Sequence, residues 1–69
     1  MILYTAFECH DCDVVKEKIS ELNIEIEIKE LKTQEEIIDS GLFAFPVLLG
    51  EGEIIAYGLD ILSLKELNP

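Results

Sequence analysis

Cys9 and Cys12, the two cysteines of the chain, are separated only by His10 and Asp11. Thiols at this spacing can form and break a disulfide reversibly, which is the chemistry of dithiol oxidoreductases. A disulfide that closes so small a loop adds little to the stability of the fold. The expected stabilisation is about 2 kcal/mol here, against about 3 kcal/mol for a 15-residue loop. The spacing therefore favours a chemical role for the pair.

Hydrophobic patterns on either side of the pair predict a strand before it and a helix after it. Residues 2–5 form a short apolar run, which indicates a buried strand. From Asp13 to Asn23, apolar residues recur every three or four positions, as on one face of an amphipathic helix of about three turns. The pair is thus expected at a strand-to-helix junction, where the positive end of the helix dipole stabilises a thiolate.

The next segment has a period of two. Ile24, Ile26 and Ile28 alternate with charged residues, which predicts a strand with one buried and one charged face. Such a strand suits the edge of a sheet, because its charges discourage edge-to-edge association.

Residues 33–41 predict a short second helix. Thr33 and Glu36 have the spacing of a capping box, and Gly41 is well suited to end the helix. Ile37 and Ile38 are expected to face inward.

The last third of the chain predicts a hairpin and a third helix. Strands at 47–49 and 53–57 flank a tight turn at 50–52, whose glycines tolerate left-handed backbone, and Gly58 breaks the second strand. Asp60 is expected to cap the final helix. The inward residues of this helix are Ile61, Leu64 and Leu67, and Asn68-Pro69 closes it.

The predicted order is β-α-β-α-β-β-α within one domain spanning residues 1–69. Strands joined through a helix are expected to be parallel, and strands joined by a hairpin antiparallel. The sequence therefore predicts an α/β fold in which three helices flank a mixed four-stranded sheet. The 49% of apolar residues can supply the small core that such a chain needs.

Charge narrows the classes of partner. The chain has 15 acidic and 5 basic residues, all of the latter lysine, and a net charge of −10. Nucleic acids are bound through Lys and Arg, and anionic lipid surfaces repel an acidic protein. We expect no nucleic-acid or membrane binding, and we expect basic surfaces of other proteins to be attracted.

Targeting signals are not evident. The apolar run at the N-terminus lacks a preceding basic region and is interrupted by Glu8. The longest nearly apolar stretch, 42–49, is shorter than the ~20 residues of a membrane span and contains Pro46. We expect a cytoplasmic monomer with its two thiols in a reducing compartment.

With the cysteine pair between the first strand and first helix, and Pro46 opening the third strand, the chain resembles the thioredoxin-fold redoxins. The compact glutaredoxin-like branch is the most similar. The resemblance covers essentially all of the chain and rests on segments 4–12, 45–47, 50–52 and 57–60. It implies a thioredoxin-like fold and a glutaredoxin-like electron carrier that reduces protein disulfides.

The resemblance also implies roles for individual residues. Cys9 is the attacking nucleophile, and Cys12 resolves the mixed disulfide. The bond between Phe45 and Pro46 is cis and frees the backbone of Phe45 to pair with an extended substrate segment. In the family, the positions of Gly58 and Asp60 also bind substrate, and the aspartate holds the γ-glutamyl amine of glutathione.

The partners implied are a disulfide-bearing protein substrate and an electron donor, with no bound cofactor besides the redox-active disulfide. The donor is glutathione or a thioredoxin-type reductase. Glutaredoxins that use glutathione usually carry a basic residue where this chain has Ala6, and glutathione is an anion, as this protein is. We therefore expect a reductase to be the better donor.

The residues between and beside the cysteines modulate the nucleophile. His10 can lower the pKa of the Cys9 thiol, whereas nearby carboxylates raise it. These carboxylates are Glu8, Asp11 and Asp13. We expect the pKa of Cys9 to be only modestly lowered, and the pair to act as a reductant.

Two alternatives dispense with redox turnover. Cys9, His10 and Cys12 offer three metal ligands, but structural zinc takes four, and no other Cys or His exists in the chain. We therefore expect no metal site within one subunit. The other alternative is a binding module with an apolar docking surface, formed by Phe43, Phe45 and Tyr57.

Overall fold

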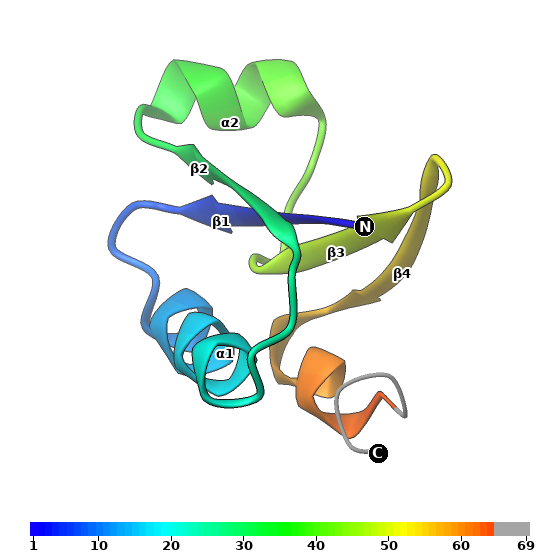
Figure 1. Ribbon diagram of the computed structural model, residues 1–69. Helices are drawn as coiled ribbons and strands as arrows, with labels where there is room; N and C mark the ends of the chain where they lie inside the picture. The colour runs from blue at the N-terminus through cyan, green and yellow to red at the C-terminus, as the bar shows by residue number, and fades with distance from the viewer. Residues whose placement is uncertain (65–69) are drawn as a thin grey trace.

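The computed structural model describes residues 1–64, which form a mixed four-stranded sheet with helices on both faces (Figure 1). The elements are β1 (Ile2–Ala6), α1 (His10–Glu21), β2 (Glu27–Leu31), α2 (Gln34–Ser40), β3 (Val47–Gly50), β4 (Glu53–Tyr57) and the 3₁₀ helix η1 (Gly58–Ser63). The strand order is β2-β1-β3-β4. The pair β1–β2 is parallel, and β1–β3 and β3–β4 are antiparallel. The predicted α/β class, element order and strand directions are confirmed.

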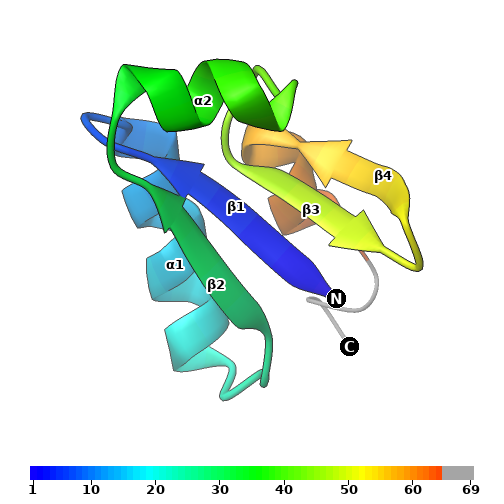
Figure 2. The ribbon, with the colours of Figure 1, turned by 90° about the horizontal axis from the view of Figure 1, so that it is seen from above.

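The helices are divided between the two faces of the sheet. Figure 1 shows α1 and η1 together below the sheet and α2 above it. Seen from above, α1 runs back along β1 in the opposite direction, so its first turn lies at the end of β1 that leads to the cysteines (Figure 2). None of the helices in residues 1–64 is long and apolar enough to cross a membrane.

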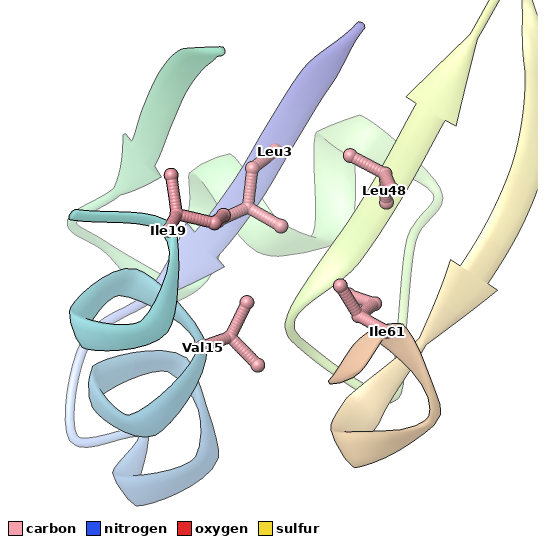
Figure 3. Packing of buried hydrophobic residues seen from close by; sticks show 5 residues of the cluster. All are labelled: Leu3, Val15, Ile19, Leu48 and Ile61. Carbon is pink, nitrogen blue, oxygen red and sulfur yellow. The ribbon is translucent and has the colours of Figure 1, made fainter. Parts of the chain in front are cut away.

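The core lies between the sheet and the pair α1 and η1. Five buried side chains form it, each 4% exposed or less, and Figure 3 shows them converging: Leu3, Val15, Ile19, Leu48 and Ile61. They come from both central strands and both helices on this face. Because apolar burial is the main source of stability in so small a domain, these contacts hold α1 and η1 on the sheet.

β2 lies at the edge of the sheet, as its charge pattern predicts, but it begins later than expected. Pairing starts with Ile2 opposite Glu27, so β1 offers no residue for Ile24 and Ile26 to pair with. These two side chains instead pack against the core from the connection that follows α1. Ile28 was expected to be buried and is 42% exposed, because an edge strand is only partly covered by α1.

The second helix has the predicted caps. The Thr33 hydroxyl accepts a hydrogen bond from the Glu36 N–H at 3.1 Å, and the Glu36 carboxylate accepts one from the Lys32 N–H at 2.7 Å. Gly41 ends the helix in the left-handed region at φ 72°. The prediction for Ile38 is wrong: it is 70% exposed. Successive helical residues point about 100° apart, so a two-turn helix on a sheet buries one of two neighbouring isoleucines better than the other.

The hairpin turn is confirmed with one change. Glu51 and Gly52 take the left-handed positions at φ 52° and 80°, whereas Gly50 belongs to β3 and pairs with Glu53. Positive φ at both central residues is the pattern of the two-residue turn that matches the twist of the strands.

The last helix differs from the prediction. η1 begins at Gly58, and Tyr57 stands at its N-cap without a side-chain bond, so Asp60 lies inside the helix and does not cap it. Gly58 adopts φ 63° and donates its N–H to the Pro46 carbonyl at 2.7 Å, which starts the turn three residues early. Leu67 and Asn68-Pro69, predicted to continue and close this helix, lie outside the described residues.

Removing the Ile61 side chain tests whether η1 belongs to the core. Ile61→Ala should lower the free energy of unfolding by about 2–5 kcal/mol, because the side chain is fully buried and leaves a cavity. The matched control, Ile38→Ala on the exposed face of α2, should change it by less than about 0.5 kcal/mol. Urea unfolding monitored by circular dichroism measures both, and equal losses in the two variants would contradict the assignment.

Candidate redox site

The cysteine pair forms a disulfide at the junction of β1 and α1. The two Cα atoms are 5.2 Å apart, within the usual range for this bond. α1 begins at His10, three residues earlier than expected, because Cys9 itself is the N-cap. Cys12 therefore lies in the first turn of the helix.

The two sulfur atoms have different surroundings. Cys9 is partly exposed, and its Sγ accepts a hydrogen bond from the Cys12 N–H at 3.1 Å. Cys12 is only 1% exposed. A backbone N–H and the positive end of the helix dipole both favour negative charge on the Cys9 sulfur. An accessible sulfur paired with a covered one can divide the roles of attack and resolution.

The acidic residues around the cysteine pair have a lysine among them. His10 and Glu8 are exposed, and Asp11 is partly buried. The Lys16 ammonium lies 3.6 Å from the Asp13 carboxylate and 3.6 Å from the Glu30 carboxylate of β2. Asp13 thus has a cation beside it, although such exposed pairs interact weakly. The i, i+3 spacing from Asp13 to Lys16 was the signal in the sequence.

Phe45, Pro46 and Gly58 are brought together beside this junction. The Phe45–Pro46 bond is cis, as the resemblance predicted, and Pro46 is buried. Tyr4 pairs with Val47, so Phe45 and Pro46 lie alongside the end of β1 from which the chain enters the cysteine loop. Gly58 is tied to the same place by its hydrogen bond to the Pro46 carbonyl. The sheet thus holds the cysteine loop and the Phe45–Pro46 segment next to each other, and the hydrogen bond holds Gly58 beside them.

Asp60 is grouped with a different feature. It is exposed and helps to line an open pocket of about 450 Å³ between β4 and η1, together with Ile54, Ile55, Ala56, Tyr57 and Leu64. Neither cysteine is part of this lining. The structure therefore does not place Asp60 in one pocket with the disulfide.

Left-handed backbone occurs just before the cysteine pair and just before the Phe45–Pro46 step. Glu8 precedes Cys9 with φ 50°, and Ala44 precedes Phe45 with φ 61°. Non-glycine residues in this region are uncommon, and such strain clusters at functional sites. Sequence reasoning missed both, because neither residue type signals a left-handed position.

A metal site gains no geometric support. Nowhere in residues 1–64 do three or more His, Cys, Asp or Glu side chains form a group that could hold a metal ion. The sulfur atoms that the metal alternative requires are joined to each other.

Comparison with known proteins adds no family assignment. No protein-family model matches this sequence, and no match was found among curated proteins. The chemical interpretation therefore depends on the disulfide, its position on α1 and the unequal burial of its two sulfur atoms.

The unequal burial predicts unequal thiol reactivity. After reduction at neutral pH, Cys9 should react with iodoacetamide about tenfold or more faster than Cys12, because only the Cys9 thiolate is both stabilised and accessible. Mass spectrometry of the alkylated peptides gives both rates. Cys9→Ser is the matched control, in which Cys12 should react slowly until the protein is unfolded. Equal rates in the folded wild type would contradict the asymmetry.

Proposed function

We propose that the protein is a thioredoxin-like, glutaredoxin-like dithiol–disulfide oxidoreductase that reduces the disulfides of other proteins. The observation that carries the proposal is the Cys9–Cys12 disulfide at the start of α1, with one sulfur partly exposed and the other covered. The mixed sheet, with α1 and η1 on one face and α2 on the other, is compatible with the compact redoxin fold that the sequence resembles.

In the proposed reaction, the Cys9 thiolate attacks one sulfur of the substrate disulfide. A mixed disulfide forms, and the other substrate sulfur leaves as a thiolate that takes a proton from solvent. Cys12 then loses its proton and attacks the Cys9 sulfur. This step forms the Cys9–Cys12 disulfide and releases the second substrate thiolate, so two electrons pass from the cysteine pair to the substrate.

The surface beside the disulfide would bind the substrate chain. The backbone at Phe45 would pair with an extended segment of the substrate, while Pro46 and Gly58 hold that loop against the sheet. Asp60, in η1, would contact the substrate farther from the disulfide. The net charge of −10 favours substrates and reductases with basic surfaces.

The electron donor in this proposal is a thioredoxin-type reductase rather than glutathione. Glutathione carries a carboxylate at each end. Glutaredoxins bind one of these carboxylates with a basic side chain at the position that corresponds to Ala6, at the end of β1. The proposed setting is a monomer in the cytoplasm, where such a reductase keeps the pair reduced.

A comparison of donors tests this choice. The oxidised protein should be reduced faster by NADPH with thioredoxin reductase than by glutathione with glutathione reductase and NADPH, because Ala6 offers no charge to a glutathione carboxylate. The rate of NADPH consumption measures both reactions under one set of conditions. Ala6→Lys is the informative variant: restoring a cation should raise the glutathione rate and leave the reductase rate less affected. Fast turnover of the wild type with glutathione would contradict the donor assignment.

Single cysteine variants test the catalytic roles. Cys12→Ser should accumulate a mixed disulfide with a model substrate such as insulin, because Cys9 attacks but nothing resolves the intermediate. Cys9→Ser should form none and lose disulfide reduction altogether. Mass spectrometry without added reductant detects the intermediate, and turnover retained by Cys9→Ser would overturn the proposed mechanism.

A redox-inactive binding module is the second candidate. Phe43 is 78% exposed and Tyr57 is 49% exposed, so both could contact a partner, whereas Phe45 is partly buried. A Cys9→Ser, Cys12→Ser double variant separates the two readings. Binding to a partner that is lost in this variant supports the disulfide reductase, and binding that is unchanged supports the module.

A further inference from the structure

A buried hydroxyl in the central strand β1 has no hydrogen-bond partner. Thr5 is fully buried, and its Oγ1 is without a partner among the residues that the structure describes. An unsatisfied buried hydroxyl costs free energy, so most such groups are paired. A methyl group in its place would avoid that cost. The hydroxyl therefore requires an explanation beyond packing.

The position of Thr5 relates it to the disulfide. Alternate residues of a strand share a face, so Thr5 points to the same side of the sheet as Leu3, whose side chain meets α1 in the core (Figure 3). On α1, the buried residues are Cys12, Val15 and Ile19, spaced along one helical face. Because α1 runs opposite to β1 (Figure 2), the step from Leu3 to Thr5 leads toward the first turn of the helix, where Cys12 is the buried residue.

We propose that Thr5 is a positioning residue for the resolving cysteine and donates a hydrogen bond to the Cys12 sulfur when the disulfide is open. The proposal rests on the proposed redox function of the pair. Neutral sulfur is a weak acceptor, whereas a thiolate accepts a strong, charge-assisted hydrogen bond. The Thr5 hydroxyl has no partner among the described residues of the oxidised protein. Once reduction releases the Cys12 sulfur from Cys9, that sulfur is free to turn toward the hydroxyl.

This difference acts on the equilibrium between the two states. Reduction breaks the Cys9–Cys12 bond and adds two electrons and two protons, all supplied by the two thiol groups of the reductant, which are themselves oxidised to a disulfide. The Thr5 hydroxyl keeps its proton and contributes only a hydrogen bond. Because that bond exists in the reduced form alone, Thr5 shifts the equilibrium toward the dithiol. It also stabilises the Cys12 thiolate that resolves the mixed disulfide.

Replacing the hydroxyl by a methyl group tests the proposal. Thr5→Val keeps the shape and the branching that suits a strand, and Thr5→Ser keeps the hydroxyl. Each variant is equilibrated with dithiothreitol buffers of set ratio, and the free thiols are trapped and counted by mass spectrometry. Thr5→Val should favour the disulfide about tenfold more than the wild type, which is about 30 mV for a two-electron couple. Thr5→Ser should stay near the wild type.

Other outcomes are decisive as well. An unchanged equilibrium in Thr5→Val, or an equal shift in Thr5→Ser, overturns the proposal and leaves Thr5 as packing. If Thr5→Val does not fold, Thr5→Ala removes the hydroxyl with less volume, and the same shift is expected. The equilibrium is set against a small thiol, so it does not depend on turnover of a protein substrate. Failure of the proposed function would appear in the cysteine variants instead, as turnover without Cys9.

Discussion

The inner face of α1 packs on the central strands through Val15 and Ile19, which meet Leu3 of β1 and Leu48 of β3. This contact orients the helix antiparallel to β1, so the chain must turn back within the three residues between them. Cys9 ends that connection as the N-cap of α1. The position of the disulfide, the exposure of one sulfur and the burial of the other all depend on this packing.

The candidate site combines segments that are distant in the sequence. The cysteine loop follows β1, the cis Phe45–Pro46 step precedes β3, and Gly58 begins η1. Antiparallel pairing of β1 and β3 places the first two side by side, and the hydrogen bond from the Gly58 N–H to the Pro46 carbonyl joins the third. A sheet with a single register can hold such a site more firmly than loops alone, because each segment is anchored by its strand.

Charge and chemistry have separate roles in this protein. The net charge of −10 acts at long range, where it selects among partners and steers their approach. The reactivity of the sulfur atoms depends on short-range groups: the Cys12 N–H on Cys9, the first turn of α1 and, in our proposal, the Thr5 hydroxyl. Lys16 pairs with Asp13, which follows Cys12 in the sequence, and with Glu30 on β2. It therefore offsets part of the acidic charge close to the disulfide.

The sequence by itself determined the features that depend on neighbours a few residues away. These include the order of the elements, the Thr33 cap and the placement of the cysteine pair before a helix, because caps, turns and periodicity are local. The tertiary structure decided which side chains are covered. It left Ile28 and Ile38 exposed, placed Asp60 inside η1, and buried the Thr5 hydroxyl without a partner. Burial depends on which elements become neighbours in space, and a local pattern does not contain that information.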